Sequence, residues 1–157
     1  MSDIDLKVPG EFSDADIAVA ARLVKIGGAL PADESTIASR LRKSRKLGLC
    51  RDGSVIVGVV SIKEPENSYR KRVFAKAKVD ISLHSNAPEV GYVTVHKDYR
   101  GQKLGQRLVE AAITEDRLTC YATTDDSSMK TILSKVGFSR QGHEWEGARG
   151  KLSLWTM

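Results

Sequence analysis

Residues 93–108 read Val93-Thr94-Val95-His96-Lys97-Asp98-Tyr99-Arg100-Gly101-Gln102-Lys103-Leu104-Gly105-Gln106-Arg107-Leu108. The apolar, β-branched start predicts a strand, and the end has the apolar spacing of a helix. The loop between them holds glycines, which let a backbone approach an anion closely, and the cations Arg100 and Lys103. Because the first turn of a helix presents unpaired N–H groups and the positive end of its dipole, this unit predicts a cradle for a pyrophosphate group.

Two nucleotide-binding motifs with the same strand–loop–helix layout do not fit this stretch. The dinucleotide fingerprint needs three spaced glycines and an acid at the end of the next strand. The glycines here lack that spacing, and the next expected strand ends in Tyr121-Ala122-Thr123. The Gly-Lys-Ser/Thr sequence of a P-loop is missing as well.

The flanking sequence predicts an α/β domain with a mixed sheet. Ser13 is a suitable N-cap, with acids in the first turn, for a helix over residues 13–30, and a second helix is expected between 35 and 48. Asp52-Gly53 is typical of a tight turn between two strands, 47–51 and 54–62. Further along we expect a strand at 89–95, a helix at 104–113, a strand at 118–122, a helix after 125–128, and strands at 138–143 and 151–155.

Two segments around the central strand carry more detailed expectations. Strict alternation places Val90, Tyr92 and Thr94 on one face of the strand and Gly91, Val93 and Val95 on the other. Residues 63–80 are polar and basic and contain Pro65 and Asn67, so we expect a loop or hairpin arm there. Residues 79–83 alternate in the manner of a strand.

Length and composition indicate a single domain over residues 1–157. No apolar run approaches the roughly 20 residues needed to span a bilayer, and the acidic N-terminus is unlike a secretory signal, so we expect no membrane contact and a cytoplasmic protein. Cys50 and Cys120 lie in apolar surroundings and are expected to be buried hydrophobes. The three histidines lack ligand spacing with acids or cysteines, so no metal site is expected.

The deciding stretch resembles the acetyl-coenzyme A motif of GNAT N-acyltransferases, Arg/Gln-x-x-Gly-x-Gly/Ala, with Arg100 and Gly105 at its ends. The preceding residues match the family's Val-x-Pro-x-Tyr approach except at Lys97, and Lys103 stands where the family usually has its first glycine. Residues 126–138 are similar to a second family pattern, Asn-x-x-Ala-x-x-Leu-Tyr-x-Lys-x-Gly-Phe. The order of the predicted elements also fits, so the resemblance covers nearly the whole chain.

The resemblance implies the GNAT acyl-CoA N-acyltransferase fold, a mixed central sheet with a splayed strand flanked by helices. It implies an N-acetyltransferase that binds acetyl-CoA as co-substrate and lets an amine attack the thioester directly. Strand 89–95 would part from its neighbour near Cys120, and pantetheine would lie in the gap. The cofactor-binding residues implied in this way are Val93, Val95, Arg100, Gly101, Gln102, Lys103, Leu104, Gly105, Asp126 and Met129.

The resemblance also suggests catalytic residues. Glu89 begins the central strand, where many family members carry an acid that acts as a base directly or through water; the alternative is that Glu89 only pairs with a basic neighbour. His84 and His96 are weaker candidates for the base. Many members use a tyrosine as general acid at the position of Leu133. With that position apolar, Tyr92, Tyr99 or Tyr121 is expected to substitute, or water.

The acceptor remains open at this stage among a small amine, a protein amine and an amine linked to nucleic acid. The cations Arg70, Lys71 and Arg72 lie in a basic segment with Tyr69 and Phe74, a composition typical of contact with a polyanion. They make nucleic acid a possible partner, through an aminoacyl-tRNA or a modified nucleobase. A non-catalytic GNAT-fold module that binds acyl-CoA or a partner is the alternative of a different class. The chain is expected to be a monomer or a homodimer.

Overall fold

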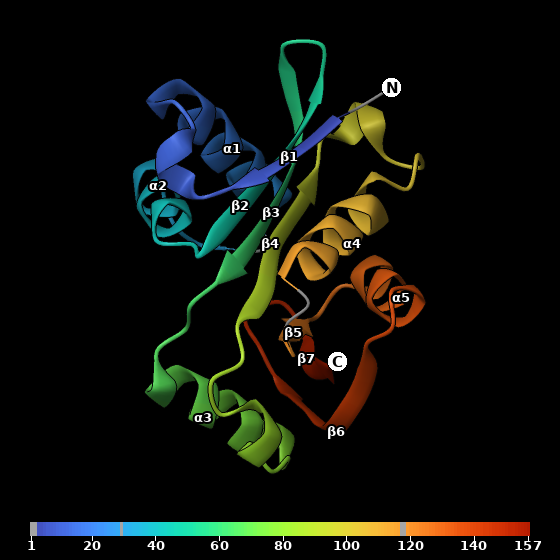
Figure 1. The fold of residues 1–157 in the computed structure, drawn as a ribbon. Coiled ribbons are helices and arrows are strands. Elements are labelled where there is room, and N and C mark those ends of the chain that lie inside the picture. The colour runs from blue at the N-terminus through green and yellow to red at the C-terminus, as the bar shows by residue number, and fades with distance from the viewer. Residues whose placement is uncertain (1–2, 29, 117–118) are drawn as a thin grey trace.

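The computed structural model describes residues 3–28, 30–116 and 119–157 and contains one mixed sheet in the order β1-β2-β3-β4-β5-β7-β6 (Figure 1). Only the neighbours β4 and β5 run parallel; every other neighbouring pair in this sheet is antiparallel. The strands are β1 (Asp3–Lys7), β2 (Lys46–Asp52), β3 (Val55–Lys63), β4 (Glu89–Val95), β5 (Tyr121–Thr124), β6 (Ser139–Glu146) and β7 (Lys151–Thr156). The helices are α1 (Asp14–Gly27), α2 (Glu34–Arg42), α3 (Asn67–Ala77), α4 (Leu104–Asp116) and α5 (Ser127–Lys135), with short 3-10 turns at Pro9–Glu11, Ser82–His84 and Lys97–Tyr99.

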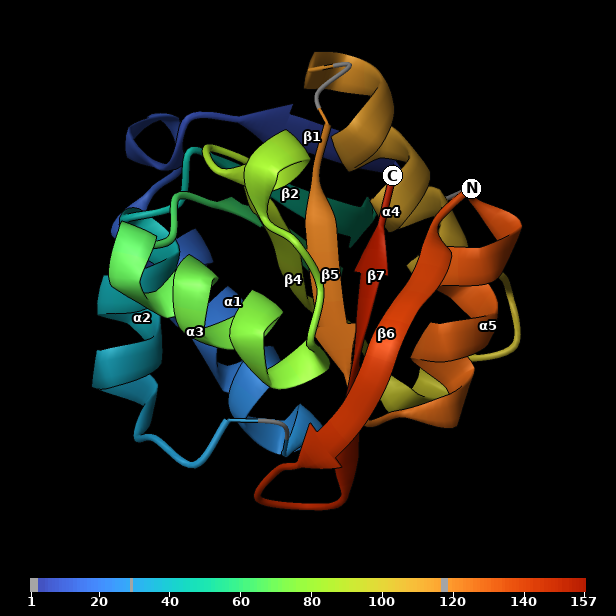
Figure 2. The same ribbon diagram turned by 90° about the horizontal axis from the view of Figure 1, so that it is seen from below.

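The helices form two layers around the sheet. Figure 2 shows α1, α2 and α3 on one side of β4, β5 and β7, and α4 and α5 on the other. One apolar cluster lies between the sheet and α4, with Leu104 and Leu108 in it, and a second lies under α1 and α2 around Ile17 and Ile37. A third cluster under α3 contains Phe74 and Tyr121. The mixed α/β fold expected from the sequence is therefore confirmed.

Several sequence signals correspond to the local structure that they predict. The Ser13 side chain accepts a hydrogen bond from the N–H of Asp16 (3.1 Å) and so caps α1, which ends at Gly28 in the left-handed conformation. Gly53, with φ of +61°, forms the tight turn between β2 and β3. Both cysteines are buried and unbridged, as expected. The fifth strand begins three residues later than predicted, at Tyr121, and Leu118 of that prediction lies outside the described residues.

The prediction of a loop or hairpin arm over 63–80 is wrong, because residues 67–77 form α3. The helix buries Val73, Phe74 and Ala77 on one face at helical spacing. The fourth residue of that face is Arg70, 3% exposed, and a charged residue at a buried position hides the amphipathic pattern from the sequence. The strand predicted at 79–83 is also absent from the described residues, which make a 3-10 turn there. A strand that was not predicted, β1, pairs along the edge of β2.

The predicted alternation of side chains along β4 is interrupted. Between the pairs Val59–Thr94 and Ser61–Gly91, β3 has one residue and β4 has two, so β4 carries a bulge. Tyr92 in the bulge takes the left-handed conformation, with φ of +52°. The extra residue resets the alternation: Val90, Val93 and Val95 pack on the α4 side, whereas Tyr92 packs on the α1 side. Val90 is thus on the face opposite to the one predicted.

Candidate active site

A gap opens in the middle of the sheet, between β4 and β5. The described residues pair these two strands only at Glu89 and Tyr121, supported by a bond from the N–H of Tyr121 to the carbonyl of Pro88 (3.1 Å). Beyond that pair, β4 remains bonded to β3 on one edge and has no strand on the other. Val93 and Val95, two of the expected cofactor-binding residues, lie on this part of β4 and pack partly buried against the α4 cluster. In the described structure, no strand pairs with this edge of β4 beyond Glu89, so the edge is open to a ligand that pairs with it as a strand does.

The loop after β4, where the sequence predicts the cradle, leads directly into the first turn of α4. Gly101 and Lys103 both have positive φ, +80° and +60°, and α4 is hydrogen-bonded from the carbonyl of Lys103, which accepts from the N–H of Arg107 (3.0 Å). The N–H groups of the first turn, including those of Leu104 and Gly105, have no acceptor within the helix. Gln102 and Lys103 are exposed, as is Arg100, whose Nε approaches the carbonyl of Val95 at 3.5 Å. The sequence-predicted cradle residues thus lie together at one helix end.

Gly105 lies where the next helix packs closely against α4. A Cβ on Gly105 would lie 2.9 Å from Cδ1 of Ile132, so α4 and α5 approach one another closely at this point. The approach brings α5 beside the cradle helix. Asp126 caps the start of α5, accepting from the N–H of Ser128 (3.3 Å), and Met129 packs partly buried against the α4 cluster. Both expected α5 residues therefore lie on the helix next to the cradle.

Glu89 lies at the closed end of the gap and is only 2% exposed. Its Oε1 accepts a hydrogen bond from Nζ of Lys63 (3.0 Å), and its Oε2 accepts from the hydroxyl of Tyr69 (3.4 Å). Burial disfavours the charge of Lys63, but the Glu89 carboxylate and its hydrogen bond, together with Tyr92 and Tyr69, raise the pKa of Lys63 overall. Burial, followed by the same negative charge, raises the pKa of Tyr69 to about 12. A buried, ionic pair with a neutral tyrosine therefore lies at the point where the two strands part.

The tyrosines proposed as proton donors differ in their surroundings. Tyr121 is fully buried, packs edge-on against Phe74 at 5.3 Å, and has the one buried side-chain polar atom without a hydrogen-bond partner in the described structure. Burial, then the charge of Glu89, raises the pKa of Tyr121, so its hydroxyl keeps its proton at neutral pH. The Tyr92 ring lies under the Lys63 ammonium, 4.0 Å from the ring centroid. Leu133 is fully buried in the α4 cluster.

A family comparison matches this arrangement. Residues 27–132 match the model of the Acetyltransferase (GNAT) family, which is two thirds of the chain and includes the gap, Glu89 and the cradle. The chain belongs to the GNAT family. No curated protein matches the chain.

Several solved structures share the fold over nearly the full length of this chain. The Escherichia coli protein ElaA matches with a TM-score of 0.74 at 14% identity, and each chain is covered to 100%. An acyl-CoA N-acyltransferase from Pseudomonas aeruginosa matches with 0.72 at 12% identity and 99% coverage of both chains. The ribosomal-protein-S18-alanine N-acetyltransferase from Escherichia coli matches with 0.69 at 15% identity, covering 100% of this chain and 93% of the other. At these identities the likeness is one of fold.

Two residues in contact with Glu89 were missed from the sequence. Lys63 was placed at the start of the expected loop, and Tyr69 within it, so neither was linked to the central strand. The register of the GNAT sheet pairs Lys63 directly with Glu89, and α3 brings Tyr69 over the carboxylate. One sequence signal could have found the pair. Lys63 and Glu89 have opposite charges and lie at the facing ends of two neighbouring antiparallel strands, where side chains pair.

The expected contact of Arg70 with nucleic acid is wrong, because Arg70 is buried. Its Nε donates to the carbonyl of Ala87 (2.9 Å) and its Nη1 to the carbonyl of Ser85 (2.9 Å). Nη1 also donates to Oδ1 of Asn67, and Nη2 donates to the carbonyl of Pro65. Arg70 therefore ties α3 to the segment that leads into β4. Lys71 and Arg72 remain exposed, and Arg72 lies 5.4 Å from the centroid of the Tyr69 ring.

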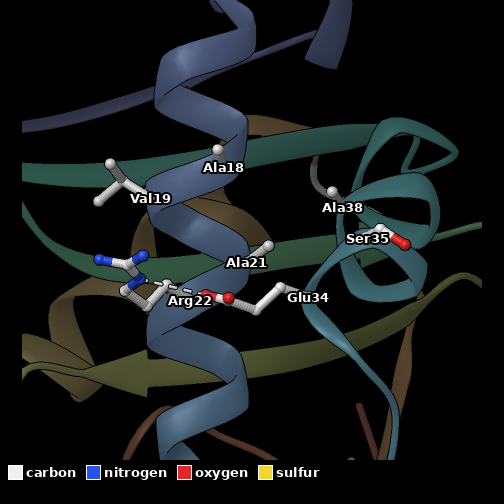
Figure 3. A pocket seen from close by; sticks show the side chains of 7 residues that line it. All are labelled: Ala18, Val19, Ala21, Arg22, Glu34, Ser35 and Ala38. Carbon is white, nitrogen blue, oxygen red and sulfur yellow. Dashed lines mark hydrogen bonds and ion pairs between the residues drawn. The ribbon is translucent and has the colours of Figure 1, made fainter.

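A surface pocket of about 310 Å³ lies between α1 and α2, away from the gap in the sheet (Figure 3). Arg22 and Glu34 form an ion pair of 3.2 Å at its edge. Its other lining residues are Ala18, Val19, Ala21, Ser35 and Ala38. Within residues 3–28, 30–116 and 119–157, no three potential ligands gather into a metal site, and no helix has the length and apolar character needed to cross a membrane.

Proposed function

We propose that this GNAT-family chain is an N-acetyltransferase that moves an acetyl group from acetyl-CoA to an amine by direct attack. One observation carries the proposal: β4 parts from β5 beside the buried Glu89 and then leads directly into the anion cradle at the start of α4. A thioester held along the free edge of β4 would have its phosphates at the helix end and its acyl group toward Glu89. We expect the protein to act in the cytoplasm, where its two buried cysteines stay reduced.

The binding part of the proposal uses backbone more than side chains. The N–H groups at the start of α4, from Leu104 and Gly105, bind the pyrophosphate, and Arg100 and Lys103 supply positive charge. Backbone groups of Val93 and Val95 pair with pantetheine as a strand edge pairs with a peptide. An N–H in this part of β4 also donates to the thioester oxygen as it becomes an oxyanion.

The chemical part needs one proton removed and one supplied. The amine nitrogen attacks the thioester carbon, the carbon–sulfur bond breaks, and the amide and the coenzyme A thiolate form. Glu89 accepts the proton that the amine loses, directly or through a water molecule, because the buried carboxylate has little surface of its own. Tyr121, whose hydroxyl is free of other partners, is the first candidate to protonate the thiolate, and Tyr92 is the second.

Calorimetry with acetyl-CoA tests the binding part. Gly105→Val fills the point where α5 approaches the cradle and should weaken binding at least a hundredfold, although folding must be checked by circular dichroism. Arg100→Ala removes one exposed charge from the cradle and should weaken binding by roughly tenfold. Lys71→Ala is the matched control, an exposed cation on α3 that should leave affinity unchanged. Wild-type affinity in both cradle variants would refute the assignment.

An acceptor screen with labelled acetyl-CoA tests the transfer. Polyamines, amino acids, peptides and aminoacyl-tRNA cover the acceptor classes, and salt dependence of the acceptor KM would identify a nucleic-acid acceptor. In the productive assay, Glu89→Gln should lower kcat by roughly 10²–10⁴-fold while acetyl-CoA affinity is kept. A protein that binds acetyl-CoA and transfers to no acceptor would instead be a non-catalytic GNAT-fold module.

A further inference from the structure

Ionisable groups from β3, α3 and β5 lie around Glu89. On β3 the neighbour is Lys63, on α3 it is Tyr69, and Tyr121 on β5 is close enough for the Glu89 charge to raise its pKa. Arg70 on α3 acts on Tyr121 in the opposite direction, and Tyr92 on β4 lies under the Lys63 ammonium. Among the described side chains, Lys63 is the only cation within ion-pair distance of Glu89.

Lys63 reaches Glu89 because of two features of the sheet. The register places the two residues directly opposite one another at the ends of β3 and β4. Gly91 then leaves room for the lysine chain: a Cβ on Gly91 would lie 2.7 Å from Cε of Lys63. The lysine chain therefore crosses the strand at the one position without a side chain, and its ammonium lies between the carboxylate and the ring of Tyr92.

The pairing is what makes a buried carboxylate tolerable at this place. An isolated carboxylate loses several kcal/mol of hydration when buried, and it avoids this cost by taking up a proton. A cation at 3.0 Å favours the charged form, and its hydrogen bond leaves one fixed orientation for the carboxyl plane. A general base must be unprotonated before the amine arrives, so the partner matters for the reaction.

We infer that Lys63 is a positioning residue that holds Glu89 ionised and oriented, with Tyr69 of α3 as a second, weaker support. The inference rests on the proposed function, in which Glu89 is the base. The helix α3, which lies between β3 and β4 in the chain, then takes part in the active site through Tyr69. This side chain contacts the base and not the acceptor. Loss of the Lys63 charge moves the acidic limb of the pH–rate profile to higher pH.

The test compares Lys63→Met and Lys63→Gln with Lys63→Arg, and uses Lys76→Met, an exposed lysine on α3, as the control. The pH dependence of kcat/KM is measured between about pH 5 and pH 9. The Met and Gln variants should lose at least tenfold in kcat/KM near pH 6 and much less near pH 8, while Lys63→Arg and the control follow the wild type. Tyr69→Phe should shift the limb in the same direction by less, because its hydrogen bond is longer.

A second readout needs no activity. Glutamate labelled at the carboxyl carbon is titrated by NMR in the protein without substrate, and Glu89→Gln identifies the Glu89 signal. Removal of the cation should move the pH at which the Glu89 signal changes upward in Lys63→Met and Lys63→Gln relative to the wild type. An unchanged titration, or a kcat/KM that falls equally at every pH, would overturn the inference. A wild-type protein with no transferase activity would refute the proposed function, and the NMR titration would still decide the role of Lys63.

Discussion

Replacing Arg70 with methionine should destabilise the protein strongly, because this buried cation anchors α3. Arg70 is 3% exposed and is bonded to four acceptors, the carbonyls of Ala87, Ser85 and Pro65 and the side chain of Asn67. Methionine fills much of the same volume and donates nothing. Ser85 and Asn67 are exposed and can bond to water instead, whereas Ala87 is 5% exposed and its carbonyl stays buried.

The loss of stability depends on which of the four acceptors can bond to water once the guanidinium is gone. A buried acceptor left unsatisfied costs about 1–3 kcal/mol, and a hydrogen bond from a charged donor contributes about 1.5–3 kcal/mol. Loss of the well-buried bonds, with partial recovery at the exposed acceptors, gives about 3–5 kcal/mol, in the range for breaking a buried ionic contact. For a chain of this size that is a fall in Tm of roughly 10 °C.

Urea unfolding followed by tryptophan fluorescence measures this loss. The matched control is Lys71→Met, the adjacent cation on the exposed face of α3, which should change the free energy of unfolding by less than about 0.5 kcal/mol. If Arg70→Met stayed within about 1 kcal/mol of the wild type, the four hydrogen bonds would not anchor α3. Arg70 could then leave its buried position at little cost and would be available to a polyanion.

Three further changes test other features. Gly142→Ala should lower the free energy of unfolding by about 2–5 kcal/mol, because Gly142 has φ of +65° and a Cβ there would collide with the carbonyl of Ala77 at the end of α3. Gly150→Ala is the control, since a Cβ there meets open space. Equal stabilities of the two variants in urea would refute this packing. Lys103→Gly should raise the free energy of unfolding by about 0.5–1 kcal/mol by relieving a left-handed lysine, and a loss of stability would contradict that reading. Because the pKa of Tyr69 is raised to about 12 and that of Tyr121 is also raised, their neutral hydroxyls contribute stability that is present below the unfolded pKa of about 10 and is lost as the pH rises through the folded values. After a jump to about pH 11, tyrosinate absorbance should therefore develop partly in a slow phase that follows unfolding; a single immediate rise to the full value would contradict the burial of these hydroxyls.

The sequence was informative where one local rule governed the structure. β4 begins and ends at the predicted residues, because its apolar, β-branched run is bounded by Pro88 and by the polar loop after Val95. The start of α1 followed from Ser13, a typical N-cap residue. The cradle residues lie together because they are consecutive in the chain at the start of one helix. Each of these features depends on residues close together in the chain.

The remaining features depend on partners far away in the sequence. Arg70 is tolerated inside the protein because it donates to the carbonyls of residues 85 and 87. The sequence of α3 itself does not predict these contacts. The bulge at Tyr92 arises from pairing with β3, and a tyrosine is not a residue that signals positive φ. Lys63 joins Glu89 through strand register and the bare backbone of Gly91. These contacts formed the part of the candidate site that the sequence did not reveal.

The bulge in β4 is not needed to bury the valines of this strand. Without Tyr92, Gly91 would still oppose Ser61 and Thr94 would still oppose Val59, with Val93 facing Val60 in an uninterrupted ladder. Val90, Val93 and Val95 would keep their present face, and the strand would hold no residue at positive φ. Deletion of Tyr92 alone would therefore give a straighter strand with the same buried valines. Because bulges bend a strand and increase its twist, the extra residue is best explained as a device that turns β4 away from β5 and keeps the sheet from closing.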